Sequence, residues 1–252
     1  MQRPSVDRIT GPEAVRDLVL IAHGGQDRSL AEPHGRRPAL LRMWPFARVA
    51  HHAAPDATIG LLRYRYRGWN DSHAHAAEDL RTALDRVATD VERVILIGHS
   101  MGGRAVLRVG AHPRVVGILA LAPWLPAGEP LPGLAGRRVV LAHGDADRMT
   151  DPRLSDAFAA RLRAAGVPTA SIRIAGETHG LLQRYDDVDE LVRRFVATMI
   201  IPAVPDPFLD SVTSADPAHG SDQLPQWNQP RGKVSAIAAV AAARLRFAGL
   251  GS

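Results

Sequence analysis

The sequence predicts an α/β protein with a mostly parallel sheet of about six strands and helices on both faces. Three observations lead to this prediction. Short runs of aliphatic and β-branched residues, such as Val94–Ile97, are typical of strands buried on both faces of a parallel sheet. These runs alternate with segments whose apolar residues recur at helical spacing, which implies right-handed crossovers. The candidate functional residues follow the carboxyl ends of the runs, where open α/β sheets place their sites.

The expected elements follow one another in order. Residues 1–16 are polar and predict an arm or a short edge element. Buried strands are expected at residues 18–22, 57–62, 94–97, 115–121, 138–142 and 169–174. Helices are expected at residues 39–50, 76–87, from 104 onward, 152–165 and 183–200.

The chain divides by composition into three parts. Residues 1–201 carry all the expected strands and form the predicted α/β domain. Residues 202–233 are rich in proline among Asp, Ser, Gln and Asn, which predicts a poorly ordered linker. Residues 234–252 are rich in alanine and predict a short C-terminal helix.

Composition excludes several classes of function. The chain has 252 residues, 46% of them hydrophobic, which suits one domain with a sizeable core. The net charge of +5 comes from arginines that are scattered rather than clustered, so no nucleic-acid partner is expected. The absence of cysteine excludes disulfides, a thiolate nucleophile and cysteine-bound metal. No run has signal-peptide character or the length of a membrane span, and we expect a cytoplasmic protein.

The strongest motif is Gly98-His99-Ser100-Met101-Gly102, which stands between a predicted strand and a predicted helix. A tight turn there forces Ser100 into a strained backbone conformation, and side chains at the two glycine positions would collide with the neighbouring strand and helix. The turn holds the Ser100 hydroxyl at the sheet edge, at a helix N-terminus that favours developing negative charge. This arrangement predicts a nucleophile.

With this motif in this context, the chain resembles the α/β-hydrolase family over roughly residues 17–200. The resemblance implies a Ser-acid-His order along the chain, with Ser100 as nucleophile. His143-Gly-x-x-Asp147 resembles the family pattern for the acid and selects Asp147, with Asp145 and Asp151 as alternatives. For the base, His179 combines a strand-end loop, a following glycine and a place after the acid.

The resemblance also implies donors for an oxyanion. One is the N–H of Met101, the residue after the nucleophile. The other belongs to the loop after the first strand, where His23-Gly24-Gly25-Gln26 is similar to the family's His-Gly-Gly form. Gly25 or Gln26 is therefore the expected second donor.

Only the short segment 125–136 separates Trp124 from the next expected strand, so no large cap is expected. The site should be open, as in compact lidless members that resemble dienelactone hydrolases and small esterases. The cysteine nucleophile of dienelactone hydrolases is absent, which argues against that activity. Trp69, Trp124 and either Leu125 or Trp44 are expected to line the substrate pocket, although such aromatics are equally common in cores.

The sequence therefore favours a serine hydrolase that cleaves a small carboxylic ester or thioester through an acyl-enzyme. One alternative is an acyltransferase or thioesterase of a biosynthetic pathway with the same Ser-Asp-His triad. Another is a non-catalytic ligand-binding protein with this fold. No phosphate-binding loop, dinucleotide motif or metal-ligand cluster is present in the sequence, so we expect no cofactor and no metal.

Overall fold

A computed structural model describes residues 3–12, 15–33, 38–200, 205–229 and 232–248. Its strands are β1 (Ser5–Thr10), β2 (Asp17–Ala22), β3 (Thr58–Arg63), β4 (Arg93–His99), β5 (Val115–Leu121), β6 (Arg138–Gly144), β7 (Thr169–Ile174), β8 (Thr213–Ser214) and β9 (Asp222–Gln223). Its helices are α1 (Pro38–Leu41), α2 (Met43–Ala53), the 3-10 turn η1 (Asp71–His73), α3 (His75–Asp85), α4 (Met101–Val109), α5 (Pro152–Ala164), α6 (Tyr185–Ile200), α7 (Pro207–Val212) and α8 (Gly232–Ala248).

Within the described residues the strands form one sheet in the order β1-β3-β2-β4-β5-β6-β7-β8, with β9 also paired to β7. The six strands from β2 to β7 are all parallel. They correspond to the six strands that the sequence predicts, which confirms the mostly parallel sheet. The strands β1 and β8 are antiparallel to their neighbours, β9 is parallel to β7, and these three strands bring the total to nine.

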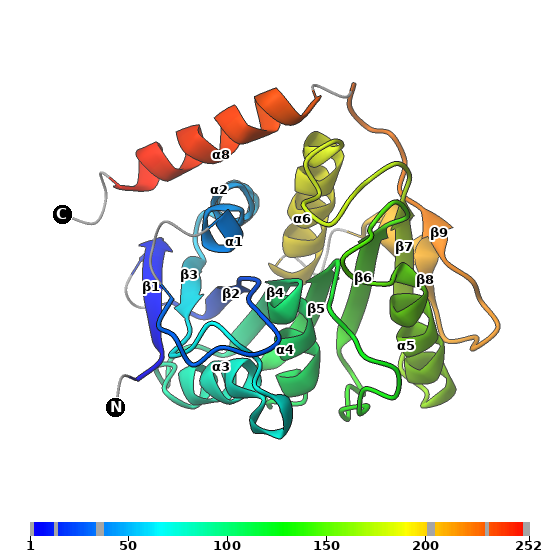
Figure 1. Ribbon diagram of the computed structural model, residues 1–252, viewed down its shortest axis with the longest axis horizontal. Helices are drawn as coiled ribbons and strands as arrows, with labels where there is room; N and C mark the ends of the chain where they lie inside the picture. The colour runs from blue at the N-terminus through cyan, green and yellow to red at the C-terminus, as the bar shows by residue number, and fades with distance from the viewer. Residues whose placement is uncertain (1–2, 13–14, 34–37, 201–204, 230–231, 249–252) are drawn as a thin grey trace.

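Two separate cores lie on the two faces of the sheet (Figure 1). Helices α2 and α6 cover one face, and α3, α4 and α5 cover the other. Strand β4 shows why its run is apolar throughout: Ile95 and Ile97 enter one core, while Val94 and Leu96 enter the other. The carboxyl ends of the parallel strands consequently meet at one edge, where the site is built.

Residues 205–229 differ from the predicted poorly ordered linker 202–233. They contain α7 and the strands β8 and β9, which pair with β7. Leu209 and Leu224 are buried in the core beneath α6, and the Asp187 carboxylate accepts hydrogen bonds from the N–H groups of Trp227 and Asn228. These few anchors offset the disordering effect of the proline-rich composition. Residues 202–204 and 230–231 of the predicted linker lie outside the described residues. Its last two residues, 232 and 233, form the start of α8.

The alanine-rich helix predicted at 234–252 corresponds to α8, and its last residues, 249–252, lie outside the described part. Between β5 and β6, residues 122–137 form no helix, so no cap is inserted there. None of the helices in the described ranges is long and apolar enough to cross a membrane.

Candidate active site

Ser100 stands at a sharp turn between β4 and α4, with φ of 57° and ψ of −119°. A positive φ is strained for a residue with a side chain, so the surroundings must hold the turn. A Cβ atom on Gly98 would lie 2.3 Å from the Gly102 carbonyl oxygen, and one on Gly102 would lie 2.2 Å from that of Ala22. Both positions therefore accept only glycine, because the contacted atoms belong to the backbone.

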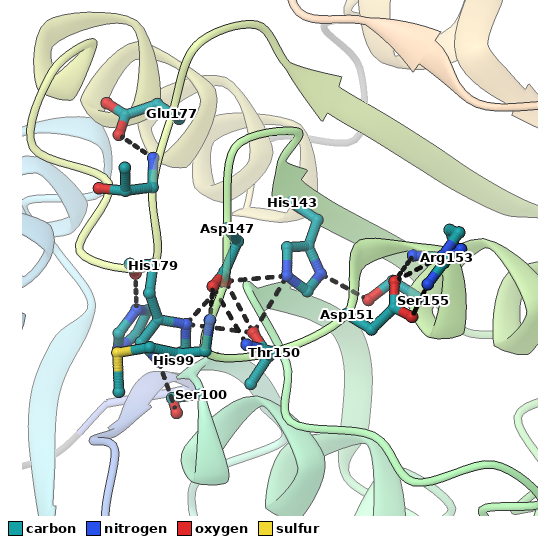
Figure 2. Close-up of polar contacts among 12 residues, drawn as sticks. His99, Ser100, His143, Asp147, Thr150, Asp151, Arg153, Ser155, Glu177 and His179 are labelled. Atoms are coloured by element: carbon teal, nitrogen blue, oxygen red, sulfur yellow. Dashed lines mark hydrogen bonds and ion pairs between the residues drawn. The ribbon is translucent and has the colours of Figure 1, made fainter.

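The structure brings Ser100, His179 and Asp147 together from the ends of three strands (Figure 2). The His179 Nδ1–H donates to Asp147 Oδ2 at 2.8 Å. Nδ1 then carries the ring proton, so Nε2 is the acceptor for the Ser100 hydroxyl, 2.9 Å away. This tautomer leaves an imidazole placed to remove the serine proton.

Asp147 is buried in a dense set of donors. Its Oδ2 also accepts hydrogen bonds from His143 Nε2 at 3.0 Å and from the Thr150 hydroxyl at 2.7 Å. Its Oδ1 accepts from the backbone N–H groups of Met149 and Thr150. Burial by itself would raise the pKa of Asp147, but the hydrogen bonds from His143, His179 and Thr150 outweigh it and hold the pKa well below its usual range. Asp147 is therefore a fixed negative charge beside the imidazole.

The two rival carboxylates have structural partners. Asp145 Oδ1 accepts the Gly176 N–H at 2.7 Å and ties the loop after β6 to the loop after β7. Asp151 caps α5 by accepting the Arg153 N–H at 2.9 Å. Only Asp147 of these three carboxylates hydrogen-bonds His179.

Three side chains that the sequence analysis did not assign to the site support it. His99 Nε2 donates to the His179 carbonyl oxygen at 2.8 Å, and burial lowers the pKa of His99 to about 3, so its ring stays neutral. Arg42 donates to the Gly180 and Leu181 carbonyl oxygens at 2.8 and 2.7 Å. His143 Nδ1 accepts from the Ser155 hydroxyl, which leaves its Nε2–H to Asp147. For His143 alone a sequence signal existed, since it stands four residues before Asp147 in the acid motif.

Of the predicted oxyanion donors, Met101 and Gly25 lie side by side, and Gln26 is excluded. A Cβ on Gly25 would lie 2.3 Å from Met101 Cε, which shows how closely the two residues approach. The Gln26 N–H donates instead to the Arg67 carbonyl oxygen at 2.8 Å, because the loop after β2 pairs with residues 67–69. The prediction for Gln26 is therefore wrong, and Met101 and Gly25 stay the candidate donors.

The predicted pocket-lining residues are only partly correct. Trp124 lines a cavity beside Ser100. Trp69 and Leu125 are buried in the core beneath α4, where the Arg104 guanidinium lies 3.9 Å from the centre of the Trp69 ring. Trp44 packs against the opposite core. Trp69 and Leu125 are therefore enclosed in the core, and Trp44 is not among the described residues that line either cavity at Ser100.

Two cavities meet at Ser100 and His179. The larger, about 440 Å³, has a mainly apolar lining that includes Leu41, Leu182, Ile237 and Val240, with Arg42 and His99 beneath it. The smaller, about 280 Å³, is lined by more polar residues, among them Gln26, Asp27, Thr150 and Trp124. Gly25 and Met149 also border both cavities. A substrate carbonyl at Ser100 would thus have one apolar and one polar neighbouring space.

The buried carboxylate of Asp189 should make the stability of the protein depend on pH. Burial raises the pKa of Asp189 to about 6, although Arg42 and Arg48 oppose the shift, and its Oδ1 has no hydrogen-bond partner among the described residues. The folded state therefore binds more protons than the unfolded state between about pH 4 and pH 6, and stability falls as the pH rises through this range. We expect the wild type to lose about 3 kcal/mol there relative to Asp189→Asn, measured by urea denaturation.

Asp56→Asn, at an exposed position, is the control for this experiment and should keep the pH profile of the wild type. Parallel profiles for Asp189→Asn and the wild type would contradict the burial of an ionisable group at position 189.

Comparison with known proteins agrees with this architecture. The family model described as "Alpha/beta hydrolase family" matches residues 18–242, and the chain belongs to this family. No curated protein matches the chain in sequence. Among the described residues, no group of three or more His, Asp or Glu side chains is placed to hold a metal ion.

Solved structures show the same fold at low sequence identity. A protein of unknown function from Agrobacterium tumefaciens, assigned to the alpha/beta hydrolases, is 16% identical with a TM-score of 0.62, over 81% of this chain and 94% of that one. Est1E from Butyrivibrio proteoclasticus, with ferulic acid bound, is 16% identical with a TM-score of 0.57, over 79% and 95%. A lidless serine hydrolase from Xanthomonas campestris is 18% identical with a TM-score of 0.54, over 80% and 90%.

Proposed function

We propose that this protein is a serine hydrolase that cleaves a carboxylic ester or thioester of a small molecule through an acyl-enzyme. The observation that supports it best is the unbroken chain of hydrogen bonds from Ser100 Oγ through His179 to Asp147, with distances of 2.9 and 2.8 Å. A serine hydroxyl attacks a carbonyl only when a base takes its proton, and this arrangement supplies the base. Several of the structural neighbours are named as esterases.

In this proposal the groups act in sequence. His179 Nε2 takes the proton as Ser100 Oγ bonds to the carbonyl carbon, and Asp147 stabilises the imidazolium that forms. The N–H groups of Met101 and Gly25 stabilise the oxyanion of the tetrahedral intermediate, and the N-terminus of α4 adds its dipole. His179 then protonates the leaving alcohol or thiol, and a water activated by the same imidazole releases the acid.

A fluorophosphonate probe tests the proposal directly. We expect one probe molecule per folded chain, attached to Ser100 in a peptide identified by mass spectrometry, and no labelling of Ser100→Ala. The probe reacts only with a serine whose proton is removed, so a ligand-binding protein without catalysis would stay unlabelled. Absence of labelling in the folded protein would overturn the proposal.

Product analysis then separates hydrolysis from acyl transfer. With an ester and an added alcohol, a hydrolase releases mainly the free acid, whereas an acyltransferase forms mainly the new ester.

The cytoplasmic location stays a prediction, which cell fractionation would test.

A further inference from the structure

Helix α8 forms one wall of the larger cavity beside Ser100. It lies across α1 and α2 at the C-terminal end of the chain (Figure 1). Ile237 and Val240, which are three residues apart and so share a side of the helix, line the cavity opposite Leu41 and Leu182. The acyl-enzyme site therefore has a cover that comes from the C-terminus and not from an insertion after β5.

The cover is held by small side chains. In the part of α8 whose side chains are described, Ala236 and Ala243 are buried, and Val240 is partly buried. Alanines allow the helix to approach α2 but cannot fill the space beneath it, so a cavity is left instead of a closed core. Ile237 is 61% exposed at the rim of the cavity, which leaves it available to contact a ligand.

The residues that line the two cavities indicate which part of a substrate each cavity accepts. Among the described residues that line the larger, apolar cavity, only the buried Arg42 and the site residues themselves could serve as partners for a polar leaving group. The smaller cavity, with Asp27 and Thr150 in its lining, suits water or a polar leaving group. An apolar chain in the larger cavity would also bring Ile237 out of water, which stabilises the contact between α8 and the bound chain.

We propose that α8 forms one wall of an acyl pocket and limits the length of the acyl group, so that the substrates are esters or thioesters of apolar acids of limited length. This inference rests on the proposed function. A cavity of about 440 Å³ lies in the range of small-molecule sites, so it accepts a chain of limited length only.

The test is an acyl-length series in two measurements. With p-nitrophenyl esters from acetate to decanoate, we expect kcat/KM of the wild type to rise by about fourfold per added methylene until the cavity is full, and then to fall. Val240→Phe places a ring in the cavity and should lower the ratio of kcat/KM for octanoate to that for acetate by about tenfold or more. Ile237→Ala should reduce the gain per methylene at the long end of the series.

Ala241→Phe is the matched control, because it adds the same ring to the same helix at an exposed position. It should keep the wild-type length profile. A flat profile in the wild type, or equal profiles for the two phenylalanine variants, would overturn the inference.

The second measurement does not depend on turnover. In the Ser100→Ala background, calorimetry with intact methyl esters of the same acids should show the same dependence of affinity on chain length, and the same loss with Val240→Phe. Length-dependent binding without hydrolysis by the wild type would overturn the proposed function and keep the acyl pocket. Hydrolysis by the wild type without length dependence would support the proposed function and overturn the acyl pocket.

Discussion

Ser100→Ala is expected to lower kcat for an ester by about 10⁶-fold, because the acyl-enzyme can no longer form. The effect is this large because the serine, the imidazole and the carboxylate act as a unit, as the unbroken hydrogen bonds from Ser100 to Asp147 indicate. The measurement is the steady-state rate with p-nitrophenyl butyrate under saturating conditions.

Ser72→Ala is the control, since Ser72 is exposed and lies outside the site. It should retain the wild-type rate, and both variants should unfold at the wild-type urea midpoint. A Ser100→Ala variant that keeps more than about one hundredth of kcat would show that another group is the nucleophile.

Asp147→Asn is expected to lower kcat by about 10⁴-fold. The carboxylate Oδ2 faces three donors, from His179, His143 and Thr150, and an amide NH₂ in its place would meet donors instead of acceptors. The imidazole would then lose both its orientation and the charge that stabilises its protonated form. Steady-state kinetics measures the loss, and Asp151→Asn, which keeps an N-cap residue on α5, should stay near the wild-type rate.

Asp147→Asn should also change how the free energy of unfolding depends on pH in the acid range. The pKa of Asp147 is depressed in the folded state, so its contribution to the free energy of unfolding is fully present above about pH 4 and is lost as the pH falls below that value. Asp147→Asn should therefore be less stable than the wild type at pH 7, and the gap should narrow towards pH 3. A gap that stays constant across this range would contradict the depressed pKa.

The parallel sheet and the turn at Ser100 were predictable for physical reasons. Strands buried on both faces must be apolar throughout, so residues such as Val94–Ile97 give a strong local signal. The turn at Ser100 needs glycine at 98 and 102 because backbone atoms occupy the space of a Cβ. Asp147 and His179 were expected from the resemblance to the α/β-hydrolase family, which implies the order Ser-acid-His and the motif that selects Asp147 over Asp145 and Asp151.

The features that the sequence analysis predicted wrongly or missed all depend on tertiary contacts. Trp69 is buried because Arg104 packs over its ring, and nothing within the local sequence shows that pairing. The Gln26 N–H is used by Arg67, forty-one residues further on. Residues 205–229 carry a disordered composition, but Leu209 and Leu224 anchor them to the core. The roles of Arg42 and His99 likewise arise from backbone carbonyls that no sequence pattern marks.

The pairing of β7 with two short strands determines how much of this edge of the sheet is exposed. β8 pairs with Thr169 and Ala170, and β9 pairs with Ile172 and Arg173. Residues 205–229 therefore cover both halves of this edge of the sheet. An exposed margin of this kind is a template for intermolecular strand addition and for fibril growth. Residues 205–229 therefore cover the edge at β7, and a chain shortened before this segment is expected to expose β7 to strand addition by other copies.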